Sequence, residues 1–81
     1  MLLDAAVEQV NQMDGSELEL KAQEIEQQRS SVSFYEKMIQ RSIDLCCDRE
    51  VCAALHVNQT SYIHPEQSRK LFVYAYLTLD N

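Results

Sequence analysis

The spacing of apolar residues changes near Ile43, and this change constrains what the chain can fold into. Before it, one apolar residue recurs every seven positions among polar ones, at Leu18, Ile25, Val32 and Ile39. That spacing is typical of a helix that packs a narrow seam against another helix. After it, residues 70–79 alternate with the period of two that a strand requires. The sequence therefore predicts a helical part followed by a β-structured part.

Residues 70–79 are the clearest of three predicted strands, and both of their faces are apolar. One face carries Leu71, Val73, Ala75, Leu77 and Leu79, and the other carries Phe72, Tyr74 and Tyr76. A helix of the same chain can cover only one face, and leaving the other in water forgoes roughly 1.5 to 3 kcal/mol for each large side chain. Contiguous exposed apolar patches usually mark binding sites. We therefore expect Phe72, Tyr74 and Tyr76 to face a protein partner.

Residues 1–32 are predicted to form a helical or coiled-coil stem. Its apolar seam consists of Leu18, Ile25 and Val32, and the complementary heptad position holds Ala22, Arg29 and Glu36. Because half of the seam is polar, it favours a specific or short pairing, as a homodimer or a heterodimer, over a strong zipper. The alternative is an ordinary solvated helix that lies on the chain's own sheet.

Asp14 and Gly15 interrupt the stem near residues 14–16. Ser16 and Glu19 have the spacing of a capping box, so a helix starts or restarts there. The interruption is either a stutter in one long helix, in which Gly15 costs about 1 kcal/mol, or the bend of a helical hairpin. The spacing is compatible with both.

The head, residues 33–81, is predicted to be α+β, with a short helix packed on a small three-stranded antiparallel sheet. The helix follows Ser33, which has capping-box spacing to Glu36, and its apolar stripe closes at Ile43. The strands are predicted at 43–47, 51–63 and 70–79, with Pro65 in the loop 64–69. Short polar connections between consecutive strands predict an antiparallel meander.

Length and charge narrow the classes of partner. Eighty-one residues make at most one domain, and a chain this short buries only roughly 60% of its unfolded surface. A net charge of −6 argues against binding to nucleic acid or to anionic membranes. The N-terminus has neither the basic region nor the apolar core of a signal peptide, and three cysteines fit no disulfide framework. We expect an intracellular protein.

Residues that could carry chemistry do not form a recognisable site. Adjacent Cys46 and Cys47 would point to opposite faces of a strand, and Cys52, His56 and His64 supply no pair with zinc-site spacing. As strand residues, Cys52 and His56 would lie about 13 Å apart, too far for a nucleophile and its base. We expect no enzyme activity, no metal and no cofactor.

From Phe34 onward the chain resembles the Spc-type subunits of the outer-kinetochore microtubule-attachment complex, whose RWD-like heads end a coiled coil. A polar helical stem, a short helix opening with Phe34-Tyr35-Glu36-Lys37-Met38, and the segments Ile63–Lys70 and Leu71–Leu77 carry the resemblance, which covers about the last 48 residues. It implies a heterodimer with a sister subunit, paired heads that dock centromere-proximal complexes, and a nuclear, kinetochore location.

Two hypotheses for function follow. The first is a non-enzymatic interaction module that dimerises through the stem and docks partners on its sheet, as a kinetochore subunit if the resemblance holds and in the cytoplasm otherwise. The second is a small acidic regulatory or inhibitor protein, bacterial or from a phage, that occupies a basic site on a target enzyme. The second hypothesis requires no sister chain.

Overall fold

Short polar side chains begin most of the helices in this chain. In the computed structural model, which describes residues 4–28, 31–58 and 65–79, Asp14 Oδ1 accepts a hydrogen bond from the Glu17 amide at 2.8 Å. Asp4, Ser31 and Asp48 cap the first turns of three further helices in the same way. These oxygens satisfy amides that have no partner within the helix. The helices are α1 (Ala5–Asn11), α2 (Gly15–Gln28), α3 (Val32–Cys46), α4 (Arg49–Ala54) and α5 (Pro65–Leu77).

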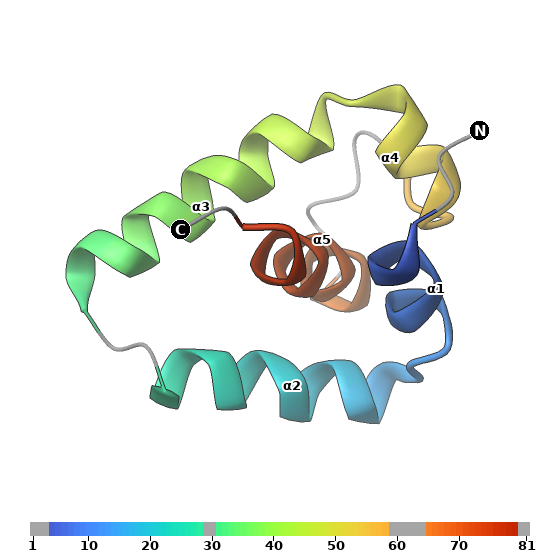
Figure 1. Cartoon of the computed structure of the whole chain (residues 1–81). Helices are drawn as coiled ribbons and strands as arrows, with labels where there is room; N and C mark the ends of the chain where they lie inside the picture. The colour runs from blue at the N-terminus through green and yellow to red at the C-terminus, as the bar shows by residue number, and fades with distance from the viewer. Residues whose placement is uncertain (1–3, 29–30, 59–64, 80–81) are drawn as a thin grey trace.

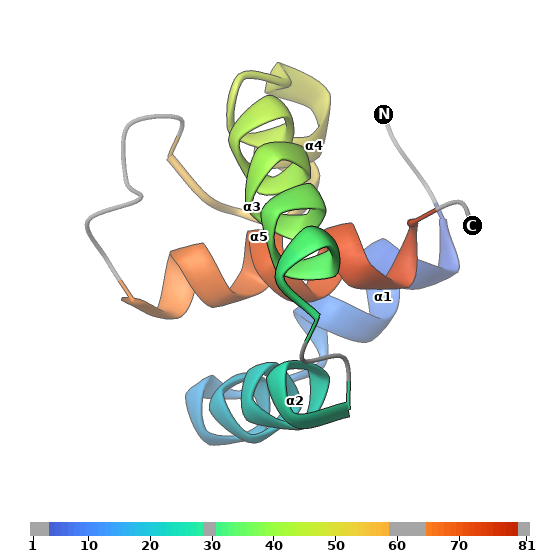
Figure 2. The ribbon, with the colours of Figure 1, turned by 90° about the vertical axis from the view of Figure 1, so that its left-hand side faces the viewer.

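Helix α5 is the centre of the molecule. Figure 1 shows it nearly end-on, with α1, α2 and α3 arranged around it, and Figure 2 shows its length crossing the molecule. It packs against all three of these helices, and α4 packs on α3. Leu71, Val73, Tyr74 and Ala75 are buried although they point in different directions around the helix axis. Residues 71–77 are apolar on every side of the helix, and such a segment is stable only when it is enclosed in this way.

The outer helices contribute one buried face each to the core around α5. The largest fully buried side chains are Leu18, Ile25, Met38, Leu55, Val10 and Val73. In α2 the buried residues are Leu18, Ala22 and Ile25, which share one side of the helix because they are spaced by three and four. The core therefore holds side chains from every helix.

Polar side chains fasten α5 to its neighbours. The Tyr74 hydroxyl donates to Asp4 Oδ2 at 3.1 Å, which joins α5 to the start of α1. Arg41 of α3 donates to the carbonyl oxygens of Ala75 and Thr78 at 3.3 and 3.2 Å. A cation at the C-terminal end of a helix donates hydrogen bonds to the free carbonyls there and interacts favourably with the negative end of the helix dipole. Arg41 therefore caps α5 from a neighbouring helix.

The predicted α+β fold is wrong, because no strand occurs in the residues that the structure describes. The third predicted strand, 70–79, lies mostly in α5. A short run of apolar residues does not distinguish a buried strand from a buried helix by its period. Pro65 was predicted to lie in a loop but is the first residue of α5. At this position its fixed φ suits the helix, and its missing N–H costs nothing.

The other two predicted strands are not strands either, and the RWD-like head is wrong with them. Residues 43–46 complete α3 and Cys47 is its C-cap, so the predicted short helix and most of the first strand are one helix of 15 residues. Of the second predicted strand, residues 51–54 lie in α4. Val51 and Leu55 are buried while Ala53 between them is exposed, which is a helical pattern rather than a strand's. Residues 59–63 of the second predicted strand lie outside the described residues.

The interruption near Gly15 is a break between two helices. Helix α1 ends at Asn11 and α2 begins at Gly15, next to the capping side chain of Asp14. A single stem helix of 30 residues would be about 45 Å long. The longest dimension of the molecule is 33 Å, so the predicted stem is folded against α5.

Two leucines of α2 provide a matched test of this packing. Replacing Leu18, which is fully buried, by Ala should lower the free energy of unfolding by about 2 to 5 kcal/mol because it opens a cavity against α5. Replacing Leu20, which is 65% exposed, should change it by less than about 0.5 kcal/mol. Urea denaturation measures both, and similar losses for the two variants would contradict the fold.

Candidate functional site

The residues of the predicted stem seam do not share one surface. Leu18 and Ile25 are buried in the core, on the side of α2 that faces α5. Val32 is the first residue of α3 and is 73% exposed. A dimer through Leu18 and Ile25 would require α2 to leave α5, so in this fold these two side chains hold the monomer together.

The three aromatic residues predicted to face a partner do not share one side of α5, because Phe72 and Tyr76 are one turn apart and Tyr74 lies on another side. Tyr74 is buried, and its hydroxyl donates a hydrogen bond to Asp4. Tyr76 meets Phe34 of α3 edge to face, with ring centroids 6.3 Å apart. Phe72 is partly exposed and lines a groove. Only Phe72 of the three therefore contributes to an open surface of the kind expected.

Helix α3 carries a row of exposed apolar side chains, of which the sequence-based hypotheses assigned only Val32 to a partner. Tyr35, Ile39 and Ile43 are spaced by four residues and are 40, 45 and 54% exposed. Val32, one turn before Tyr35, continues the row toward the start of the helix. We call these four residues the α3 stripe. It lies beside the buried face of the same helix, which includes Phe34 and Met38.

Three residues of the α3 stripe, Tyr35, Ile39 and Ile43, form one wall of a groove of about 710 Å³. The opposite wall is α2, through Ala22 and Glu26, and the floor is α5, through Leu71 and Phe72. Leu71 is nearly buried and Phe72 partly exposed, so the floor is apolar. Ser42, Cys46, Cys47, Ser68 and Arg69 complete the lining. The groove is thus built by three helices and lined chiefly by apolar side chains.

A polar contact joins the two walls at one place. The Tyr35 hydroxyl donates to Glu26 Oε1 at 3.4 Å. The negative charge of Glu26 raises the pKa of Tyr35, and desolvation and the hydrogen bond raise it further. Tyr35 therefore keeps its proton at neutral pH, and its hydroxyl links α3 to α2, whereas Ile39 and Ile43 of the same wall have no polar group to bond.

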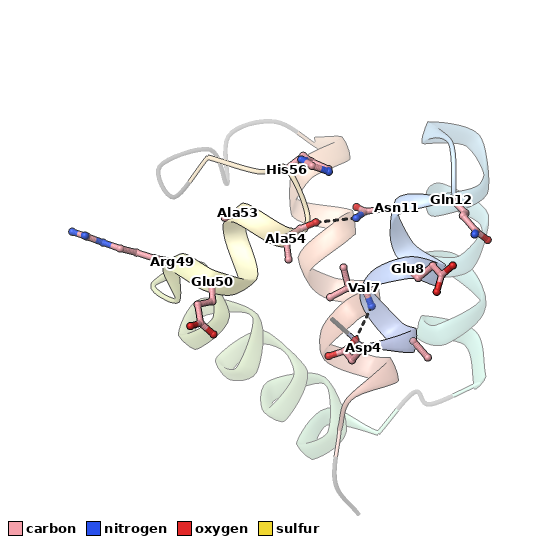
Figure 3. A pocket seen from close by; sticks show the side chains of 11 residues that line it. Asp4, Val7, Glu8, Asn11, Gln12, Arg49, Glu50, Ala53, Ala54 and His56 are labelled. Carbon is pink, nitrogen blue, oxygen red and sulfur yellow. Dashed lines mark hydrogen bonds between the residues drawn. The ribbon is translucent and has the colours of Figure 1, made fainter. Parts of the chain in front are cut away.

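A second hollow, of about 1050 Å³, lies between α1 and α4 (Figure 3). Its walls are bridged by a hydrogen bond of 2.8 Å from Asn11 Nδ2 to the Ala54 carbonyl. Figure 3 shows Arg49 extending away from α1, so the charged groups do not converge on a common point. Its apolar lining consists of alanines and the buried Val7. Although it is larger, this hollow has no exposed large apolar side chain to anchor a partner.

The cysteines show no arrangement suited to nucleophilic chemistry. Cys52 is buried, and its sulfur lies 3.4 Å from the Cys46 carbonyl oxygen. Burial raises the pKa of the Cys52 thiol, and the nearby Cys46, Asp48 and Cys47 raise it further. All three cysteines are thiols rather than disulfides. Within the described residues, no three potential ligands gather into a metal site, and His64 of the weighed zinc set lies outside them.

Comparison with models of protein families, with curated proteins and with solved structures gave no match to this chain. Among residues 4–28, 31–58 and 65–79, no helix combines the length and the apolar character needed to cross a bilayer. The function therefore has to be inferred from the groove and its surroundings.

Thiol labelling tests the environment of Cys52. At neutral pH we expect Cys52 to react at least about tenfold more slowly than the exposed Cys47, because it is buried and a raised pKa leaves little thiolate. Mass spectrometry of the native protein after timed labelling gives both rates, and urea-unfolded protein, in which the rates should converge, is the control. Fast labelling of native Cys52 would instead favour a catalytic thiol.

Proposed function

We propose that this chain is a non-enzymatic protein–protein interaction module that receives a helix of a partner protein in the groove between α2 and α3. The observation that carries the proposal is the α3 stripe, in which Ile39 and Ile43 remain about half exposed beside a fully formed core. The stripe and the apolar floor make one continuous surface.

The physical reason is that such a surface is unfavourable in water. Covering the exposed halves of Ile39 and Ile43 would contribute roughly 1 kcal/mol each, half the value for burying a whole side chain. Monomeric proteins leave apolar patches of at most a few hundred Å² uncovered, and the larger ones are often functional.

The shape of the groove suits a helix. Its walls are α2 and α3 and its floor is α5, so an added helix would complete a layer on the side of these walls away from the core. The axis of the added helix would then lie about 8 to 10 Å from the axes of the helices it packs on, as is usual for packed helices. Ile39 and Ile43 are one turn apart and match the one-turn spacing of anchors on an amphipathic helix.

The partner contact is placed at the groove and not at the predicted stem seam, because α5 already covers Leu18 and Ile25. The proposal does not include a kinetochore role, because that role implied an RWD-like α+β head, and the described residues of the head are helical. The absence of enzyme activity remains part of the proposal, and the buried, protonated Cys52 supports it. Three thiols support an intracellular location, because disulfides are rare in reducing compartments.

The acidic inhibitor is a second candidate, favoured by the charge of α2. This helix has four glutamates and one lysine, and Lys21 lies 3.8 Å from Glu24. An inhibitor of this kind would present carboxylates to a basic site on an enzyme. Its binding would survive a change at Ile39, whereas docking in the groove would not.

A neutral helical peptide tests the proposed function. The probe is an amphipathic helix of Leu, Ala and Gln, titrated into the protein and followed by amide chemical shifts in NMR. We expect shifts at groove residues such as Ala22 and Phe72, and Ile39→Asp should weaken binding at least about tenfold because it places a charge in the apolar contact.

The matched control is Leu20→Asp, which also puts a charge on an exposed apolar position of the surface but outside the groove. It should leave the affinity within about twofold, in line with the small effects of surface changes away from a contact. Equal losses in the two variants, shifts centred on the hollow between α1 and α4, or no saturable binding would count against the proposal.

A further inference from the structure

We infer that the helix received by the groove is cationic, with lysine or arginine residues on both sides of its apolar face. This inference rests on the proposed function, since it names the partner of the same groove. Its basis is the charge of the groove's rim, which is independent of the apolar lining.

Carboxylates border the groove on the side of α2. Glu26 lines it directly, and Glu19 lies two turns earlier on the same side of the helix. Both are exposed. Lys21, the one basic residue of α2, lies across the buried face from this side and is next to Glu24. The α2 rim is therefore acidic over at least two turns.

Glutamates are also present on the other two helices, α5 and α3. Glu66, at the start of α5, has its carboxylate carbon 3.6 Å from the point that a Cβ on Gly15 would occupy, so it lies against the start of α2. Glu36 of α3 is exposed and lies between Val32 and Ile39 on the outer edge of the stripe. Carboxylates thus lie beside the groove on α2, through Glu19 and Glu26, and on α3, through Glu36.

Positive charge is scarce at the groove. Among the described residues that line it, Arg69 is the one basic residue and Glu26 the one acidic residue, so the negative charge comes from the rim around them. Arg41 of α3 is directed to the C-terminal end of α5, where it bonds to Ala75 and to Thr78, and is not available to a partner in the groove. A helix with acidic flanks would meet carboxylates along both edges, whereas one with basic flanks would be attracted to them.

The net charge of the whole chain acts in the same direction. At −6, two copies of this protein repel each other, and an oppositely charged partner is drawn in over roughly the Debye length of 8 to 10 Å. Both terms disfavour a second copy as the occupant of the groove. They favour a basic amphipathic helix of a different protein.

Three peptides with the same apolar residues test the inference: the neutral probe above, and versions with Lys or Glu at the flanking positions. By isothermal titration calorimetry we expect the Lys peptide to bind at least about tenfold more tightly than the neutral one and the Glu peptide more weakly, with the differences shrinking as salt is added. Equal affinity for the Lys and neutral peptides would overturn the inference and leave groove docking intact.

Charge variants separate the rim from the net charge. The double variant Glu19→Lys and Glu26→Lys should weaken binding of the Lys peptide at least about tenfold, whereas Glu8→Lys with Glu50→Lys, which makes the same change in net charge at the other hollow, should weaken it less than about threefold. Glu26→Gln, which keeps an acceptor for Tyr35, should show an intermediate loss and guards against misfolding of the reversal. Equal losses for the two double variants would overturn the inference.

Sedimentation of the isolated protein completes the test. We expect a monomer at every concentration studied, for wild type and for Ile39→Asp alike. A wild-type dimer that Ile39→Asp dissociates would make a second copy the occupant and overturn the inference. Failure of the neutral peptide to bind the groove would, separately, overturn the proposed function on which the inference rests.

Discussion

The enclosure of α5 is the constraint on which the other elements depend. Its residues Leu71, Val73, Tyr74 and Ala75 are buried on different sides, so no single neighbour can shelter them. Three helices are needed, and α1, α2 and α3 surround α5 as a result. Each of them needs only one apolar face for this purpose, which is why α2 is polar everywhere else apart from Leu20. The arrangement lets a short chain form a core without a sheet.

The sequence predicted the periodicity of the outer helices better than that of the inner one. The side of α2 marked by Leu18 and Ile25 is its buried face, because a solvated helix shows its inner side as spaced apolar residues. In residues 71–77 of α5 every side is apolar, so the helical period has no polar residues to reveal it there, and an alternation of aliphatic and aromatic residues resembles a strand. Two local residues did indicate helices: Pro65 suits the first turn of a helix, and Asp48 is a residue type that caps a helix, as it does in α4.

The groove was not predicted from the sequence, again because residues of a helix were assigned to strands. Phe72 and Val32 were assigned to a partner, and both lie at or beside the groove, but they were placed on two separate surfaces by the incorrect strand. Drawn as one helix, α3 has an apolar arc wide enough for two neighbours, with Phe34 and Met38 on one half and Ile39 and Ile43 on the other. That excess width is a signal present in the sequence once residues 43–47 are assigned to the helix.

Apolar exposure and acidic charge have opposite effects on association, and in the proposed function their combination selects the partner. The α3 stripe attracts any apolar surface, including the stripe of another copy, and such attraction alone leads to self-association. Negative charge on Glu19, Glu26 and Glu36 makes the approach of an identical, equally acidic stripe unfavourable, so like copies are kept apart while a basic helix is not. In the proposed complex the same carboxylates would take part in recognition, while in the free protein their charge opposes self-association. That proposal accounts for two isoleucines that stay about half exposed beside a finished core.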